Sequence, residues 1–381
     1  MKRDLDSVIS NSINAKPVIL VGARQAGKTT LAKMIASQAN GYQYFNYDVA
    51  EDRKIILKQA WDSYSSVLIL DEIQKMKQWK TWLKGVIDSK KPKMKLLVTG
   101  SMKLNLLRRS GDSLAGRYLQ HHLYPVTIAE LQQEYSWDAQ QSLEHLLRRG
   151  GFPEPCLATN DATAQQWHNQ YARDIIRNDL LELDSIRSIS SIDVLYEELR
   201  SKVGSPLSIT ALARDIGLSH HLVQKYLTLF EAVFLLFKIT PWHKNIAHAN
   251  KLQPKYYFYD VSQVKRSRGV TLENIVAIEL HQWVQLQNDL GKGSYALHYI
   301  RTKDDAEVDF VISNHNTPTL LIECKQSDGK PSKSLINIAK RCGNAETIQL
   351  VEQINHPYKV GSVAIQPMAQ WLVNYCSIKI M

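Results

Sequence analysis

The chain has 381 residues, of which 44% are hydrophobic and 22% are charged, and it carries a formal net charge of +10. This length and composition predict two or three folded domains and exclude collagen, coiled-coil rods and wholly disordered chains. The apolar runs are too short to span a membrane, and the four cysteines form no CxxC pair. We therefore expect a cytoplasmic protein with no membrane partner, no zinc site and no disulfide framework.

Two segments together carry more positive charge than the net charge of the whole chain. Lys75–Lys95 carries eight lysines and one acid, and Pro241–Val270 carries six basic residues and one acid. Concentrated positive charge favours a polyanionic partner such as DNA. The alternative is an ordinary solvated surface.

Residues 1–125 alternate short apolar runs with amphipathic stretches. The runs Pro17–Val21, Gly41–Asn46, Val67–Leu70 and Lys95–Thr99 are typical of strands buried on both faces of a parallel sheet. The alternation predicts an α/β fold, with a P-loop ATPase core over residues 1–125.

A phosphate-binding loop follows the first of these runs. Gly22–Thr30 reads GARQAGKTT and matches the P-loop spacing between an apolar strand and a helix. Its glycines let backbone N–H groups point at phosphate oxygens, and the helix dipole adds to the attraction. Lys28 is predicted to reach the β- and γ-phosphates of ATP, and Thr29 to ligate Mg²⁺. The predicted cofactor-binding residues are Gly22, Ala23, Arg24, Gln25, Ala26, Gly27, Lys28, Thr29, Thr30 and Ser101.

Two acids end the run Val67–Leu70. Asp71 is predicted to hold the Mg²⁺ shell, and Glu72 to polarise the attacking water as general base. Paired acids at this place are typical of hydrolysing ATPases, so we expect Mg²⁺-dependent ATP hydrolysis with Lys28 and Glu72 as catalytic residues.

Two further positions bear on this reaction. The run Leu96–Ser101 ends in hydroxyls, and either Thr99 or Ser101 is predicted to sense the γ-phosphate, unless this is an ordinary turn. Arg117 is predicted to be catalytic by reaching the ATP of a neighbouring subunit in an ATP-dependent homo-oligomer. The alternative is a surface or structural arginine.

Residues 126–245 are mostly helical in pattern and contain a candidate helix-turn-helix over Ser208–Leu227. Ser219 is the expected N-cap of the second helix, whose first turn exposes side chains suited to phosphates or base edges: His220, His221 and Gln224. The apolar run Phe230–Ile239 is a candidate wing strand. We therefore expect a helical lid and a winged-helix domain that binds DNA, with packing against protein as the alternative.

Residues 246–381 have a mixed α/β pattern. The expected elements, in chain order, are helix Leu272–Leu286, strands Tyr295–Arg301, Glu307–Ser313 and Thr319–Lys325, helix Lys333–Arg341 and strand Thr347–Val351. The two-residue period of a strand places Glu307 and Asp309 on the same face of their strand. In the next strand it places Glu323 and Lys325 on one face and Cys324 on the other.

These acids predict a nuclease-like pocket. Asp309 and Glu323 are candidate Mg²⁺ ligands, Lys325 can orient a water, and Glu273 on the preceding helix can supply another ligand. The alternative is an exposed strand pair with a Glu323–Lys325 salt bridge of little worth.

With these motifs in hand, the chain resembles the bacterial and archaeal ATPases of the AAA+/STAND-related group that carry a C-terminal DUF4143 region. The resemblance rests on motifs along nearly the whole chain: Gly22–Thr30, Leu70–Gln74, Thr99–Ser101, Leu114–Arg117, Gly150–Glu154, Tyr257–Asp260, Glu273–Asn274, Glu307–Phe310 and Glu323–Lys325.

The resemblance implies an ATPase core, a winged helix over 126–245 and a PD-(D/E)XK nuclease-like domain over 246–381. It also implies ATP and Mg²⁺ at Lys28, Thr29, Asp71 and Glu72, and a restriction-endonuclease-like site at Asp309, Glu323 and Lys325. A departure is that Val261-Ser262 follows Asp260, where the family usually has a Gly two residues after the Asp.

The function expected from these parts is an ATPase that couples its nucleotide state to engagement, remodelling or cleavage of duplex or branched DNA. The alternative is a nucleotide-dependent switch or scaffold that binds a protein partner and carries a catalytically silent nuclease-like domain.

Overall fold

The computed structural model describes residues 1–62, 64–101, 114, 116–180, 189–243, 253–302, 304–327 and 329–377. The chain divides into two compact units. The first contains residues 1–125 and 232–234, and the second contains residues 126–231 and 235–381. A single unit therefore holds both of the domains predicted over 126–245 and 246–381.

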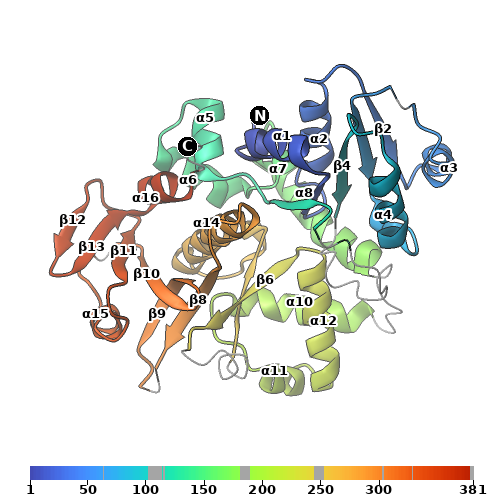
Figure 1. Cartoon of the computed structure of the whole chain (residues 1–381). Helices are drawn as coiled ribbons and strands as arrows, with labels where there is room; N and C mark the ends of the chain where they lie inside the picture. Colours follow the sequence, from blue (N-terminus) through green and yellow to red (C-terminus); the bar gives the residue numbers. More distant parts are fainter. Residues whose placement is uncertain are drawn as a thin grey trace. The chain divides into compact units, whose positions relative to one another are not determined.

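The first unit is built on a five-stranded parallel sheet with the strand order β2-β3-β4-β1-β5, of which Figure 1 labels β2 and β4. Its elements are α1 Leu5–Ala15, β1 Val18–Gly22, α2 Lys28–Ala36, β2 Tyr42–Asn46, α3 Ala50–Lys58, β3 Val67–Asp71, the 3₁₀ turn η1 Ile73–Lys75, α4 Trp79–Ser89, β4 Lys95–Gly100 and β5 Leu119–Leu123. The predicted α/β class is confirmed by this sheet and its helices.

Burial follows each strand's place in this sheet. Every residue of β1 and β3 is buried, because both strands have a neighbour on each side and α1 or α2 packed against them. Strand β2 lies at the edge, and its residues are exposed or half-buried. The expectation that Gly41–Asn46 is buried on both faces was therefore wrong, since an edge strand lacks a neighbour on one side.

The second unit begins with helices and ends in an eight-stranded mixed sheet of order β12-β13-β11-β10-β9-β8-β6-β7. Its helical elements are α5 Ile128–Tyr135, α6 Ala139–Arg149, α7 Pro153–Cys156, α8 Asp161–Asp174, the π-helix η3 Ile175–Asp179, α10 Ile189–Lys202, α11 Ile209–Asp215, α12 His220–Ala232, η4 Val261–Gln263, α14 Arg268–Asp289, α15 Lys333–Ala339 and α16 Met368–Cys376. Its strands are β6 Leu236–Pro241, β7 Lys255–Phe258, β8 Tyr295–Arg301, β9 Glu307–Asn314, β10 Thr317–Lys325, β11 Glu346–Val351, β12 Tyr358–Val360 and β13 Val363–Pro367.

The large sheet crosses the boundary that we predicted at residues 245 and 246. Strand β6 pairs antiparallel with β7 and parallel with β8, so elements from both sides of the boundary are neighbours. Helix α14 packs against β7, β8, β9 and β10, and α15 packs against β9 and β10 (Figure 1). Apolar side chains of α15 and the inner strands, Leu335 and Leu321 among them, form one buried cluster.

Local signals explain where several helices begin. Helix α5 begins with a capping box between Thr127 and Glu130, and α6 begins with one between Asp138 and Gln141. Ser219 accepts a hydrogen bond from the backbone N–H of Leu222 at 3.2 Å, as expected of the cap of α12. The expected wing strand over Phe230–Ile239 is not one element, because the run contains the end of α12 and the start of β6.

Candidate functional site

The P-loop connects β1 to α2 with a backbone that requires glycine at both ends. A Cβ on Gly22 would lie 2.1 Å from the carbonyl oxygen of Leu123 on β5, so a larger residue would push these strands apart. Gly27 has φ +93°, in the left-handed region, and immediately precedes Lys28, the first residue of α2. The loop thus ends at a helix N-terminus, where backbone N–H groups favour a bound phosphate.

Lys28 lies inside the loop. Its side chain is buried, and its Nζ donates hydrogen bonds to the carbonyl oxygens of Gly22 at 3.0 Å and Ala23 at 2.7 Å. These carbonyls hold the ammonium beside the loop that is predicted to receive the phosphates. An incoming phosphate would compete for the same N–H groups with a full negative charge, which makes the stronger hydrogen bond.

Asp71 lies at the end of β3 and gathers three hydroxyl donors. Thr29 donates to its Oδ2 at 2.7 Å, Tyr44 donates to the same oxygen at 2.9 Å, and Thr99 donates to Oδ1. Thr29, Tyr44 and Thr99 come from α2, β2 and β4, so neighbouring elements of the parallel sheet bring them together. The pKa of Tyr44 is raised, mainly by its own burial and then by the charge of this carboxylate.

Glu72 follows Asp71 and turns away from the strand with a positive φ of +56°. Its Oε2 accepts a hydrogen bond from Ser101 at 3.1 Å and another from the Gln74 amide. Burial raises the pKa of Glu72, and the nearby charge of Lys28 opposes that rise. The role of Gln74 was not predicted from the sequence. Its position two residues after Glu72, within the LDEIQ run, is the signal that could have identified it.

These residues fit a magnesium nucleotide. A hydroxyl and a carboxylate are the oxygen ligands that Mg²⁺ accepts, and Thr29 and Asp71 are already 2.7 Å apart. Thr29 and Asp71 would hold the ion, and the ion would neutralise phosphate charge. Among the residues that the structure describes, both hydrogen bonds to Glu72 reach Oε2, which leaves Oε1 to accept a proton from water.

Three further predicted residues of this unit have partners in the structure: Arg117, Thr99 and Ser101. Arg117 donates from Nε to Asp88 Oδ1 at 3.2 Å, and its side chain is 38% exposed. This exposed ion pair is the surface arrangement that we considered as the alternative to a role in a neighbouring subunit. Thr99 contacts Asp71, and Ser101 contacts Glu72, so these two hydroxyls serve different carboxylates.

The second unit brings the predicted nuclease-like residues to one region of the large sheet. Asp309 on β9 accepts a hydrogen bond from the backbone N–H of Cys324 on β10 at 2.8 Å. Burial, and then the charge of Glu273, raises the pKa of Asp309 to about 7. Glu323 is buried, receives a hydrogen bond from Ser332 and forms an ion pair with Lys325 at 2.8 Å.

Glu273 on α14 has partners that the sequence did not reveal. Its Oε1 accepts a hydrogen bond from Tyr257 at 2.7 Å and lies 3.5 Å from Nζ of Lys255. Lys255 also forms an ion pair with Glu307 at 2.5 Å. Within the described ranges, no group of three or more acidic, His or Cys side chains is arranged to hold a metal ion.

A second buried polar centre joins α8 to the turn after β7. Asp260 accepts hydrogen bonds from His168 at 2.9 Å, from Ser262 at 2.7 Å and from Gln263 at 2.8 Å. Gly150 packs beside it, with φ +67° and room for no Cβ, because Asp260 and His168 stand 2.9 and 3.1 Å from that position. This contact gives a structural reason for two sequence motifs, Gly150–Glu154 and Tyr257–Asp260.

Comparisons with known proteins match three segments of the chain. Residues 14–132 match the family described as an AAA domain (AAA_14), residues 140–273 match a domain of unknown function (DUF8612), and residues 268–371 match another (DUF4143). The chain therefore contains a segment that matches an AAA domain and carries the P-loop, and a C-terminal segment that matches DUF4143. An AAA domain with this loop supports nucleotide-dependent, ATPase-type activity.

Curated relatives align over most of the chain. An uncharacterised protein of Mycobacterium tuberculosis is 24% identical over 327 residues, covering 83% of this chain and 72% of its own. Uncharacterised proteins of Methanocaldococcus jannaschii and Haemophilus influenzae are each 25% identical; they cover 83% and 80% of this chain, and 76% and 85% of their own lengths.

Two solved structures are also similar. The Walker-type ATPase PABY2304 of Pyrococcus abyssi has a TM-score of 0.42 and 14% identity over 73% of this chain and 96% of its own. A point variant of Thermotoga maritima RuvB has a TM-score of 0.33 and 17% identity over 62% of this chain and 89% of its own.

Among the described residues, the helices are too short or too polar to cross a membrane.

Proposed function

We propose that this protein hydrolyses ATP with Mg²⁺ and uses its nucleotide state to control engagement with duplex or branched DNA. The observation that carries the DNA part is the arrangement of α10, α11, α12 and the strand pair β6–β7. Three helices are followed by two antiparallel strands, and Pro206, between α10 and α11, forms a bridge with Lys255 on β7. This order of elements supports a winged helix.

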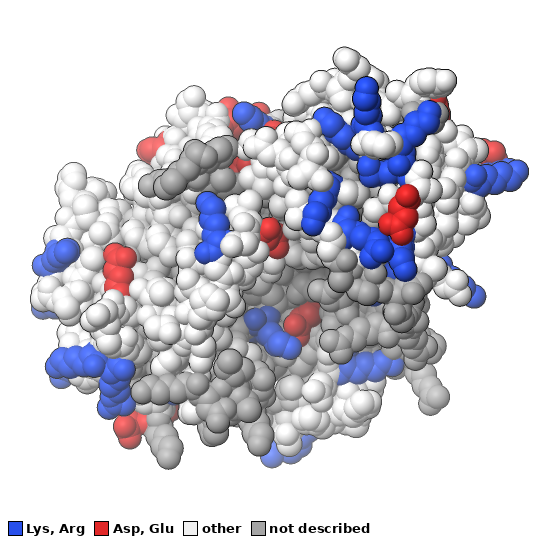
Figure 2. All heavy atoms as spheres, in the orientation of Figure 1, with Lys and Arg blue, Asp and Glu red and all other residues white. Residues whose placement is uncertain are grey.

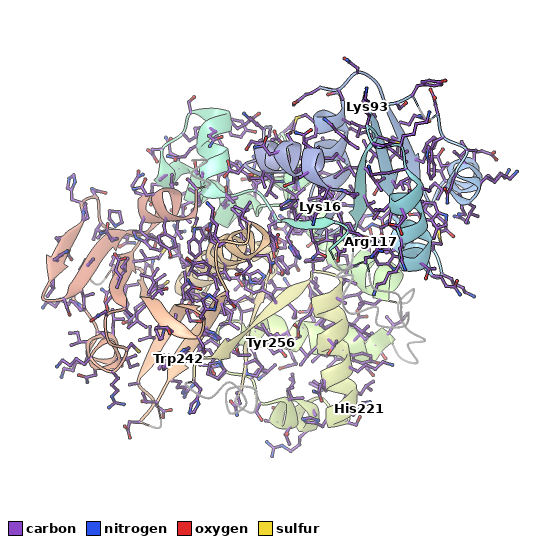
Figure 3. The ribbon with its side chains drawn as sticks, in the orientation of Figure 1. Lys16, Lys93, Arg117, His221, Trp242 and Tyr256 are labelled. Atoms are coloured by element: carbon purple, nitrogen blue, oxygen red, sulfur yellow. The ribbon has the colours of Figure 1, made fainter. Side chains whose placement is uncertain are left out.

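The second helix of that motif offers a polar face. His220, Gln224 and Thr228 recur every four residues along α12, so they lie on one face of the helix, and all three are exposed. The three residues line a groove of about 530 Å³ with Lys238 and Thr240 of β6. His221, also exposed, lies on α12, while Trp242 and Tyr256 lie by the neighbouring strands (Figure 3). An exposed polar helix face beside a strand pair is suited to the major groove of DNA.

Positive charge in the first unit adds support. In Figure 2, Lys and Arg side chains gather over the part of the face where Figure 3 labels Lys93. Lys77, Lys91 and Lys93, on the segments that flank α4, are exposed. Basic side chains release counterions when they neutralise phosphates, so affinity for DNA should fall steeply with salt.

The chemistry of hydrolysis follows from the site described above. Lys28 would exchange the carbonyl oxygens of Gly22 and Ala23 for phosphate oxygens, and Thr29 and Asp71 would hold Mg²⁺, which stabilises charge on the phosphates. Glu72, steadied by Ser101 and Gln74, would accept a proton from the attacking water. Arg117 is proposed to act on the ATP of a neighbouring copy, which would require it to leave Asp88.

The test measures ATP hydrolysis by the full chain with Mg²⁺, alone and with single-stranded, duplex and four-way-branched DNA. We expect stimulation by duplex or branched DNA, and DNA binding that weakens at least about tenfold between roughly 50 and 200 mM salt. Substituting Gln224→Glu and Thr228→Glu together should weaken binding by charge repulsion. Gln166→Glu, exposed on α8, is the matched control.

The DNA part of the proposal would be refuted by two results together: a hydrolysis rate that none of the three DNA forms changes, and an affinity for DNA that is equal at the two salt concentrations. The nucleotide-dependent switch with a protein partner would then be the better description. A loss of hydrolysis in Lys28→Ala would still be expected, because the nucleotide site does not depend on DNA.

A further inference from the structure

The carboxylates of the nuclease-like region already have a cation of their own. Lys255 on β7 is 1% exposed, and its Nζ lies 2.5 Å from Glu307 Oε1 and 3.5 Å from Glu273 Oε1. The ring of Tyr299 covers the same ammonium at 5.1 Å from its centroid. A lysine is almost never buried to this extent unless carboxylates accompany it.

We propose that the ammonium of Lys255 is the resident cation of the cluster formed by Glu273, Glu307 and Asp309, in the place where a nuclease would keep a divalent metal ion. The residues present do not fit a metal, because each candidate ligand is engaged. The proposal concerns the second unit alone and does not depend on the proposed function in ATP hydrolysis or DNA binding.

Each carboxylate of this region already has a hydrogen-bond or ion-pair partner. Glu273 accepts from Tyr257 as well as facing Lys255, and Glu307 faces Arg301 at 3.7 Å on its other oxygen. Asp309 accepts the backbone N–H of Cys324. Glu323, the other predicted ligand, is held by Lys325 at 2.8 Å and by Ser332.

Charge and burial then oppose a divalent ion. A metal that recruited both Glu273 and Glu307 would take both ion-pair partners from Lys255, and a buried ammonium that has lost its ion pairs is strongly unfavourable. The ion would also stand close to that ammonium and be repelled by it. The carboxylates whose charge acts on the ammonium of Lys255 are Glu273, Glu307 and Asp309. The other two cations nearby have carboxylates of their own, since Arg301 pairs with Asp305 at 2.9 Å and Lys325 with Glu323 at 2.8 Å.

The cation comes from outside the segment that carries the nuclease-like motif. Lys255 lies in the stretch that matches DUF8612, whereas Asp309 and Glu323 lie in the DUF4143 match. The pairing of β6 with both β7 and β8 brings β7 to this part of the sheet. The nuclease-like domain is therefore expected to contribute structure or DNA contact without metal-dependent cleavage.

The test measures binding of Mn²⁺ to the nucleotide-free full chain by the loss of the free-ion EPR signal. Wild type and Asp309→Asn should bind the same amount of Mn²⁺, since the cluster contributes no site. Any ion at Thr29 and Asp71 is common to both proteins and is removed by Asp71→Asn. Lys255→Met should gain a site at least about tenfold tighter than any cluster site in wild type, because the repelling ammonium is gone, and Lys255→Met with Asp309→Asn should lose it.

An Mn²⁺ site in wild type that Asp309→Asn abolishes and Asp71→Asn leaves intact would overturn the proposal. So would a folded Lys255→Met protein that gains no Asp309-dependent site. If Lys255→Met does not fold, the comparison of wild type with Asp309→Asn is the test. Equal Mn²⁺ binding by these two proteins supports the proposal, and weaker binding by Asp309→Asn refutes it.

Discussion

The buried pair of His168 and Asp260 makes the stability of the second unit depend on pH in a specific direction. His168 Nδ1 lies 2.9 Å from Asp260 Oδ2, and Nε2 lies 3.0 Å from the carbonyl oxygen of Arg149. Both of these oxygens accept hydrogen bonds, so both ring nitrogens must donate, which only the protonated imidazole can do. Burial by itself would lower the pKa of His168, but the hydrogen bond and charge of Asp260 outweigh it and raise that pKa.

The sign of the effect follows from that raised pKa. The stabilisation is fully present below the unfolded pKa of about 6.5, and it is lost as the pH rises through the higher folded pKa. When His168 loses its proton, one of the two hydrogen bonds of the charged ring is lost. The free energy of unfolding should then fall by about 1.5–3 kcal/mol. Asp260 stays ionised throughout, because His168, Gln263 and Ser262 together lower its pKa despite its burial.

The assay is urea unfolding of wild type and His168→Gln at about pH 6, below the unfolded pKa of about 6.5, and at about pH 9, well above it. Taking the difference between the two proteins cancels other histidines, such as His145 and His298, whose burial lowers their pKa. We expect the variant to lose about 3–5 kcal/mol at the lower pH, because Asp260 then lacks its charged partner, and markedly less at the higher pH. A difference that is equal at the two pH values would refute the protonated pair.

Three further changes test other parts of the structure. Gly150→Ala should destabilise the protein by about 2–5 kcal/mol in the same urea assay, through backbone strain and overlap with Asp260; Gly291→Ala, at φ +68° with open space around it, should cost only about 1–2 kcal/mol. Equal losses at the two glycines would contradict the close packing. Glu72→Gln should keep ATP binding, followed by fluorescent-nucleotide titration, while hydrolysis falls about 10²–10⁴-fold, and a wild-type rate would remove Glu72 as the base. Arg117→Ala should slow steady-state hydrolysis without weakening ATP binding, and an unchanged rate would return Arg117 to its surface ion pair with Asp88.

Local patterns were enough to predict much of the secondary structure. Strand β8 occupies Tyr295–Arg301 as expected, and α2 begins at Lys28, where the P-loop ends. Strands β1, β3 and β4 lie in the predicted runs because a mainly apolar run between turns is suited to the interior of a parallel sheet. The start of the second helix in the candidate helix-turn-helix was also determined locally, with Ser219 as its cap, but α12 continues past the predicted Leu227 to Ala232.

The arrangement of the candidate nucleotide site could be predicted from the sequence for a related reason. A P-loop is one continuous segment, and Asp71 follows directly on an apolar strand, so their roles depend on short-range chemistry and on the rule that parallel strands end at one edge. This rule predicts that the P-loop and the end of β3 lie side by side, and the hydrogen bond between Thr29 and Asp71 agrees with it. Tyr44, the third hydroxyl on Asp71, lay on a strand whose edge position no local pattern revealed.

By itself the sequence determined the α/β class, the P-loop with its paired acids and the order of most helices and strands, because these depend on residues close together in the chain. Only the tertiary structure decided the partners of buried charges. His168 meets Asp260 across 92 positions, and Lys255 meets Glu307 across the large sheet. A buried charge must find its counter-charge wherever the fold supplies one, and strand pairing, rather than neighbouring residues, determines which one is near.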